Sequence, residues 1–216
     1  MSEVGVRGHG IRWWTATLFM VGSACFAGAS IPAVADVVPA SALGATYFVG
    51  SLFFTTAGYL QFRQSLPRPD GSWAWFGVRT RSVDWWAAGL QSVGTLWFNV
   101  NTFDALTTGL TVQQQNLRIW TPDFLGSICF LVSSVLAVAA VGQGWWPHRR
   151  TLEWRLAMTN LAGSVFFMLA ALAAFVLPST SDLLDASLAN SGTLLGALCF
   201  YAAAAFDRRH LRRASH

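Results

Sequence analysis

One phrase recurs three times along this chain. A tryptophan near charged residues is followed nine residues later by a glycine, which opens a motif of the form Gly-small-x-x-Phe or, near the N-terminus, Gly-Ser-Ala-Cys-Phe. The tryptophan and glycine pairs are Trp13 and Gly22, Trp85 and Gly94, and Trp154 and Gly163. A repeat at this spacing predicts one supersecondary unit used several times. We therefore expect three tandem hairpins over approximately residues 12–62, 81–146 and 150–206.

The chain also contains six mostly apolar runs, and a membrane-spanning helix needs about 20 such residues. The runs cover residues 13–35, 41–62, 84–106, 122–146, 153–177 and 190–206. Only 11% of the 216 residues are charged, whereas soluble domains usually carry about 25%. We therefore expect an all-α, polytopic membrane helix bundle, with six transmembrane helices built as three two-helix repeats in a single integral membrane domain over residues 1–216.

Helix starts and loops follow from capping residues and prolines. Ser82 and Thr151 are expected N-caps, and Thr121-Pro122-Asp123 is typical of a cap, an N1 proline and a first-turn acid. All seven prolines fall at run ends or between runs, so none is expected inside a helix. The polar stretch 107–121 is accordingly predicted to be a plain loop, whereas 63–83 mixes arginines and aromatics that suit a headgroup layer.

The arginines predict the orientation. All 14 basic residues are arginines, and only Arg118 lies on the side opposite the others. Because basic residues stay cytoplasmic, we expect the N- and C-termini both on the cytoplasmic side of the membrane. Tryptophans on the arginine side, including Trp145 and Trp146, would form an interfacial belt. A cleavable signal peptide is the competing interpretation of the first run, but that run shares the repeat.

The Gly-small-x-x-Phe motif occurs in all six runs. Its glycines are Gly22, Gly50, Gly94, Gly126, Gly163 and Gly196, and Gly192 adds a close-contact pair with Gly196. Glycine allows two helix backbones to approach closely, and the phenylalanine four residues later lies on the same face. We favour a helix-packing role for all seven glycines over the alternative, a shared binding surface around a pseudo-threefold axis.

The interiors of the runs hold no charged residue or histidine, which argues against ion-coupled transport, haem and metal sites. No lysine is present for a Schiff base, no nucleophile–base or nucleotide motif appears, and the three cysteines suit packing. We expect no enzyme activity, catalytic residue or cofactor, and no nucleic-acid partner.

Polar residues gather in the third run. Interhelical hydrogen bonding is the favoured interpretation, and a neutral polar pocket opening outward is the alternative. The candidate pocket residues are Gln91, Thr95, Asn99, Asn101, Asp104 and Asn160. Gln91 and Asn160 both lie three residues before a motif glycine, so they are expected to bond each other or nearby carbonyls. Arg118 has Asp104 and Asp123 as expected partners.

Three phrases resemble known bacterial proteins. The segments 86–95, 98–103 and 120–127 look like a group of mainly actinobacterial multi-pass proteins, and the hairpins resemble the small YrhK-like membrane domain. The resemblance implies a multi-pass protein of a bacterial cytoplasmic (inner) membrane and supplies no active site.

Two functions follow as hypotheses. The first is a non-catalytic packing, subunit or scaffold protein, with the lipid bilayer and a homo-oligomer or membrane subunit as partners. The alternative is a passive transporter or channel for a small neutral solute, because mitochondrial carriers also consist of three two-helix repeats. Those carriers have proline kinks and acidic–basic networks in their odd helices, and the interiors of the odd runs here have neither.

Overall fold

The computed structural model describes residues 3–66, 75–142 and 150–214. Regular structure in these ranges is helical, apart from one isolated bridge between Val176 and Leu183. The six long helices are α1 (Glu3–Ala29), α3 (Ala40–Gln64), α4 (Val83–Asp104), α6 (Thr121–Val141), α7 (Leu152–Ala173) and α8 (Ala186–Ala214). Shorter pieces are α2 (Pro32–Ala35), α5 (Val112–Gln115) and the π-helical turn η2 (Asn116–Trp120).

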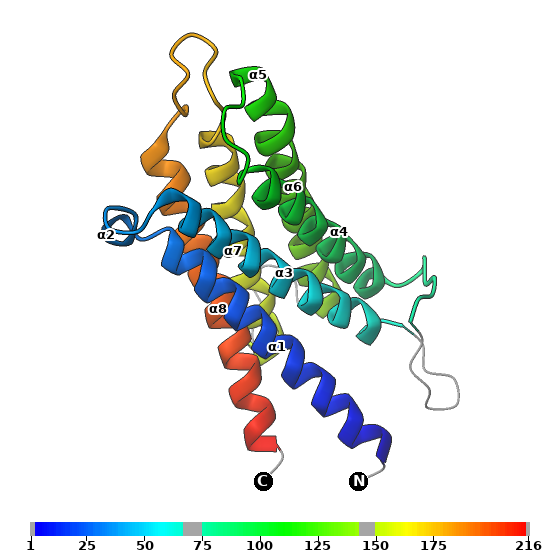
Figure 1. Ribbon diagram of the computed structural model, residues 1–216. Coiled ribbons are helices and arrows are strands. Elements are labelled where there is room, and N and C mark those ends of the chain that lie inside the picture. The colour runs from blue at the N-terminus through cyan, green and yellow to red at the C-terminus, as the bar shows by residue number, and fades with distance from the viewer. Residues whose placement is uncertain (1–2, 67–74, 143–149, 215–216) are drawn as a thin grey trace.

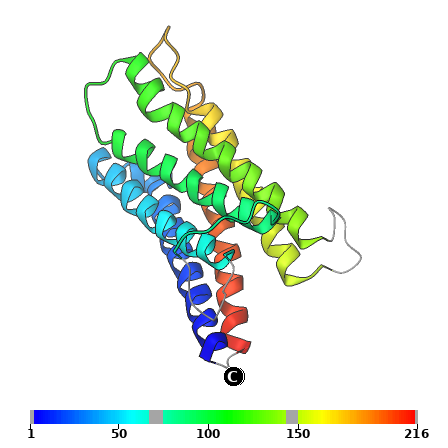
Figure 2. The same ribbon diagram turned by 90° about the vertical axis from the view of Figure 1, so that its right-hand side faces the viewer.

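The long helices pack as a closed ring. Each contacts the next along the chain, and α8 returns to pack against α1. The most extensive contacts lie within the pairs α1–α3, α4–α6 and α7–α8. Figures 1 and 2 show these helices running side by side. In Figure 1 both chain ends lie at one end of the bundle and α5 at the other, and α2 lies at the end of α1 that is far from the N-terminus. We call the two ends the termini side and the distal side.

Four helical segments of the described chain are long and apolar enough to cross a membrane: Ala40–Gln64, Val112–Val141, Leu152–Ala173 and Ala186–Arg213. The helices α1 and α4 are not among them. In α4 the mean hydropathy is lowered by the polar stripe that contains Gln91 and Asn99, although the helix spans 22 residues.

The predicted caps at Ser82 and Thr151 form. The Ser82 hydroxyl accepts a hydrogen bond from Trp85 N at 3.3 Å, and that of Thr151 accepts one from Trp154 N at 3.3 Å. The first and last helices are joined on the termini side, where Arg12 Nε donates to Asp207 Oδ2 at 3.1 Å. Two tryptophans of the expected belt, Trp145 and Trp146, lie outside the described residues.

The loop predicted over 107–121 is helical from residue 112 onward, and the cap predicted at Thr121 is wrong. Thr111 is the N-cap, in a capping box with Gln114, and the helix continues from Val112 to Val141 through the π-turn η2. Pro122 therefore lies inside a helix. The wider π-turn before the proline tolerates its missing N–H, and the Thr121 hydroxyl donates to Asn116 O at 2.8 Å.

Candidate functional site

The motif glycines bring the paired helices into close contact. A Cβ atom added to Gly94 would lie 2.8 Å from the Phe130 ring and 3.0 Å from Cys129 Cβ. The facing glycine, Gly126, would meet the Phe98 ring at 3.0 Å and Gly94 O at 3.1 Å. The phenylalanine of the partner motif thus occupies the space where each glycine lacks a side chain.

The same exchange occurs in the other two pairs. Gly163 faces Cys199 and Phe200, while Gly50 faces Cys25 and Phe26. The remaining motif glycines, Gly22 and Gly196, face the carbonyl oxygens of Gly50 and Gly163, and Gly192 faces Phe166 O at 2.9 Å. The cysteine of each pair therefore packs on the opposite glycine, whichever helix carries it.

Six motif phenylalanines meet at the centre of the ring. They are Phe26, Phe54, Phe98, Phe130, Phe167 and Phe200, and all are at least 94% buried. Rings of paired helices lie 4.8 to 5.6 Å apart, as for Phe98 and Phe130 at 4.8 Å. Rings of different pairs also touch, including Phe98 and Phe167 at 5.8 Å. We call this group the Phe cluster.

The residue after each motif glycine is fully buried between neighbouring pairs. These residues are Ser23, Ser51, Thr95, Ser127, Ser164 and Ala197. Hydroxyls there bond across the gap between pairs, as Ser51 does with Thr102 at 2.9 Å and Ser164 with Ser134 at 2.7 Å. Ser23 Oγ is buried and has no hydrogen-bond partner.

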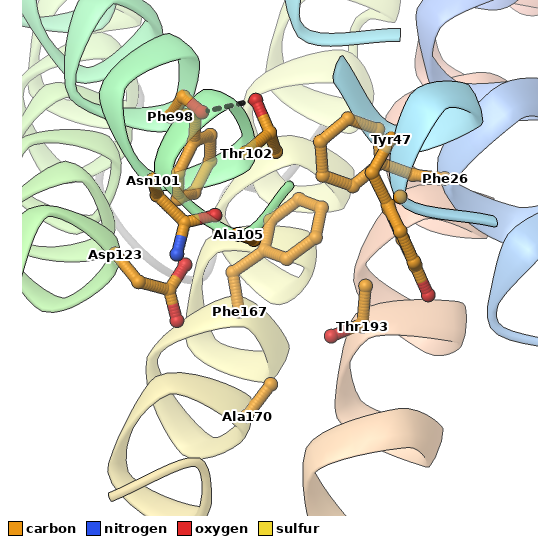
Figure 3. A pocket seen from close by; sticks show the side chains of 11 residues that line it. Phe26, Tyr47, Phe98, Asn101, Thr102, Ala105, Asp123, Phe167, Ala170 and Thr193 are labelled. Carbon is orange, nitrogen blue, oxygen red and sulfur yellow. Dashed lines mark hydrogen bonds between the residues drawn. The ribbon is translucent and has the colours of Figure 1, made fainter. Parts of the chain in front are cut away.

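A cavity of about 170 Å³ lies on the distal side of the Phe cluster (Figure 3). Three rings of the cluster line it together with Asp123 and other residues of five helices. The further lining residues are Gly44, Tyr47, Asn101, Thr102, Ala105, Ala170 and Thr193. Three of its side chains, Tyr47, Asp123 and Thr193, each lie three residues before a motif glycine, so the three helix pairs contribute equivalent positions. We call it the distal cavity.

A second cavity, of about 230 Å³, lies on the termini side. It too receives equivalent positions from all three pairs: Phe19, Gln91 and Asn160 each lie three residues before a motif glycine. Its lining also includes Gln61, Gln64, Ser133, Ser134, Phe200 and the Arg12–Asp207 ion pair. This termini-side cavity shares no lining residue with the distal cavity, and the Phe cluster lies between them.

The structure divides the candidate pocket residues between several places. Gln91 and Asn160 line the termini-side cavity, and Asn101 lines the distal one. Gln91 and Asn101 are ten residues apart, roughly 15 Å along a helix, and Phe98 lies between them on α4. The predicted single pocket is therefore replaced by two cavities, because the Phe cluster closes the space between its members.

The other three candidates bond to neighbouring groups. Thr95 is fully buried, and its hydroxyl donates to Ser92 O at 2.6 Å. Asn99 Nδ2 donates to Thr55 Oγ1 on α3 at 2.8 Å, which is the interhelical bonding that the sequence favoured. Asp104 pairs with Arg118 at 3.0 Å. Gln91 Oε1 accepts from Ser133 Oγ at 3.1 Å, so its identified partner is a serine of α6.

Asp123 is the site residue that sequence reasoning missed. The sequence pattern predicts a first-turn acid at a helix entry. The helix in fact starts eleven residues earlier, at Val112, and Asp123 lies beyond the π-turn. Figure 3 shows its carboxylate beside Asn101 at the edge of the distal cavity. The signal available in the sequence was its position three residues before Gly126, which matches Tyr47 and Thr193.

Comparison with protein-family models, curated proteins and solved structures finds no match to this chain. The resemblance to YrhK-like and actinobacterial multi-pass proteins stays a prediction that rests on the three phrases quoted above.

Proposed function

We propose that this chain is a six-span membrane protein of three hairpins whose central axis forms a gated, passive pathway for a small solute. The six spans are supported by the distribution of polarity in α4. Its polar Gln91, Thr95 and Thr102 are buried, while Leu96 and Phe103 are 52% and 58% exposed. An apolar outer face with a polar inner face suits a helix that contacts lipid. The same argument extends to α1, which buries Thr15 and Ser23.

The three-hairpin architecture is supported by equivalent contacts. Each pair of long helices exchanges glycine and phenylalanine in the same way, and each contributes equivalent positions to both cavities. Equivalent residues lie at the same sequence offset from the motif glycine in all three pairs. Triplication of one ancestral hairpin would explain that regularity.

The pathway is supported by one observation above all. Two cavities, each lined by both polar and apolar side chains, lie on opposite sides of the Phe cluster, and every helix pair lines both. Hydrophobic constrictions between wetted vestibules gate by excluding water. The Phe cluster fits such a gate, because Phe54 and Phe130 have 1% and 0% of their surface exposed. The amides and hydroxyls of the termini-side cavity suit a small polar solute.

Solute flux in proteoliposomes tests the pathway. We expect Phe130→Ala to increase the entry rate of urea or glycerol, followed by stopped-flow light scattering, by at least severalfold, because removing a central ring opens the gate. Phe103→Ala is the matched control, since that ring is 58% exposed on the outside of the bundle. Phe98→Leu is a milder variant should Phe130→Ala fold poorly. Rates at the level of protein-free liposomes for the folded wild type and both gate variants would contradict the proposal.

A packing, subunit or scaffold role is the second candidate. It is favoured by the closed Phe cluster, which in this conformation leaves no continuous opening between the two cavities. Native mass spectrometry of gently extracted protein separates the two functions. A stoichiometric membrane partner together with absent flux would support the scaffold role.

A further inference from the structure

We propose that the distal cavity binds a small organic cation of the alkylammonium class. The inference concerns binding alone and holds whether or not the solute crosses the bundle. It combines four properties of the cavity: its charge, its aromatic walls, the direction of its hydrogen-bonding groups and its size.

The charge of the cavity is carried by Asp123. Among the described residues that line the cavity, Asp123 and the phenol of Tyr47 are the only side chains that can ionise. The nearest expected counter-ion, Arg118, pairs instead with Asp104, through Nη2 to Oδ1 at 3.0 Å and Nε to Oδ2 at 3.3 Å. Because the helix runs from Val112, Asp123 lies at no free helix N-terminus that would balance its charge. The carboxylate thus makes the cavity attractive to a cation.

Aromatic rings form the walls of the same cavity. Phe26, Phe98 and Phe167 line it from three different helix pairs, and Tyr47 adds a fourth ring. Figure 3 shows the rings of Phe26, Phe98, Phe167 and Tyr47 gathered around one space, with Asp123 at its edge. Ring faces attract organic cations, most strongly where water is excluded, and such aromatic enclosures recognise methylated ammonium groups.

The hydroxyl groups of the lining present acceptors because their hydrogens are already used. Thr193 Oγ1 donates to Ala189 O at 2.8 Å, and the single hydrogen of the Thr102 hydroxyl goes to Phe98 O at 2.7 Å or to Ser51 Oγ at 2.9 Å. One N–H of the Asn101 amide donates to Ile119 O at 2.9 Å. Ser30 Oγ donates to Phe26 O, so the Tyr47 hydroxyl must donate to Ser30 in their 2.8 Å contact. These hydroxyls and the Asp123 carboxylate therefore offer a ligand oxygen lone pairs, which complement N–H donors and cations.

Size and ligand count favour an organic cation over a metal ion. Calcium takes six to eight oxygen ligands at 2.3–2.6 Å, whereas this lining supplies one carboxylate among mainly aromatic and aliphatic groups. Within the described ranges no three His, Cys, Asp or Glu side chains come together. A volume of about 170 Å³ accommodates an ion such as methylammonium or tetramethylammonium and little more. In the termini-side cavity the carboxylate of Asp207 is already paired with Arg12, so that cavity lacks this property.

Isothermal titration calorimetry of the full chain in detergent tests the site. Tetramethylammonium and methylammonium chloride are the probes, titrated at constant ionic strength maintained with sodium chloride. We expect saturable binding to the wild type, and at least a tenfold weaker affinity for Asp123→Asn, which keeps the shape of the side chain and removes its charge. Asp182→Asn is the matched control and should bind as the wild type does, because the exposed Asp182 lies outside the cavity lining and Asp104 stays paired with Arg118.

A second variant guards against a folding defect in Asp123→Asn. Ala105→Leu adds bulk to an exposed lining residue and leaves the carboxylate intact, so it too should weaken binding. The proposal is overturned if the wild type binds neither probe, if folded Asp123→Asn binds as well as the wild type, or if neutral tert-butanol binds as tightly as tetramethylammonium. Absent flux with intact, Asp123-dependent binding would reject the pathway and leave this site standing.

Discussion

Ser23 and Ser51 occupy the same motif position on α1 and α3 and are both fully buried, yet their hydroxyls differ in bonding. Ser51 bonds Thr102 at 2.9 Å and donates to Phe48 O at 2.7 Å, whereas Ser23 Oγ has no partner. At the same motif position of α7, Ser164 bonds Ser134, which lies eight residues past Gly126 on the neighbouring helix α6. On α8, which packs against α1, the residue eight positions past Gly196 is Ala204. Ala204 carries no hydroxyl that could bond Ser23. A buried hydroxyl without a partner lowers stability.

We therefore expect opposite effects from one substitution at these two sites. Ser23→Ala should raise the free energy of unfolding by about 1 kcal/mol, because it removes an unsatisfied buried hydroxyl, and Ser51→Ala should lower it by a similar amount. Thermal or denaturant unfolding in one detergent measures both. Equal effects of the two variants would show that the Ser23 hydroxyl is satisfied in solution.

At the scale of elements, the hairpins depend on close approach at the glycines. Gly94 and Gly126 leave no room for a side chain, because the partner phenylalanines fill the space above them. Gly28, also helical, has no atom within 4 Å of an added Cβ. Glycine is therefore required for close packing at Gly94 and Gly126, whereas at Gly28 it only lowers the stability of the helix.

Alanine at these two glycines should separate the roles. Gly94→Ala is expected to lower the free energy of unfolding by about 2 kcal/mol, since its methyl group overlaps the Phe130 ring. Gly28→Ala should leave stability unchanged or raise it by up to about 1 kcal/mol. Both variants are compared by the midpoint of thermal unfolding in detergent. If Gly94→Ala were as stable as the wild type, the close packing of α4 on α6 would be refuted.

For the whole molecule, the question is which helices cross the membrane. Hydropathy identifies four segments, and the proposal adds α1 and α4, which hide their polar residues inside the ring. The four-span and six-span arrangements place Thr107 on different sides of the membrane relative to Thr80. If α4 spans the membrane, Thr107 and the exposed Thr80 lie on opposite sides; if it does not, they share a side.

Cysteine labelling distinguishes these arrangements. In a variant without native cysteines, we expect an impermeant maleimide added to intact cells to label Thr107→Cys and Ser179→Cys, and to label Thr80→Cys and His210→Cys only after permeabilisation. All four residues are exposed at the ends of the bundle. Labelling of Thr80→Cys and Thr107→Cys from the same side would rule out six spans.

The sequence alone determined much of the local structure. Alternation of apolar runs and capping residues indicated the six long helices, because a chain so poor in charge must satisfy its backbone internally. The caps at Ser82 and Thr151 were predicted from residues within one turn of each helix start. Thr121 was misjudged, because a π-turn that accommodates Pro122 leaves no simple pattern in the residues around it.

The tertiary structure decided where these residues meet. The polar residues of α4 form one stripe in the sequence, but Phe98 and the phenylalanines of five other helices divide that stripe between two cavities. The sequence predicts Asp123 as a first-turn acid, whereas the π-turn and the packing of α6 place it at the edge of an aromatic cavity. Helical spacing assigns a residue to a face, and only the packing of six helices around a common centre decides what that face encloses.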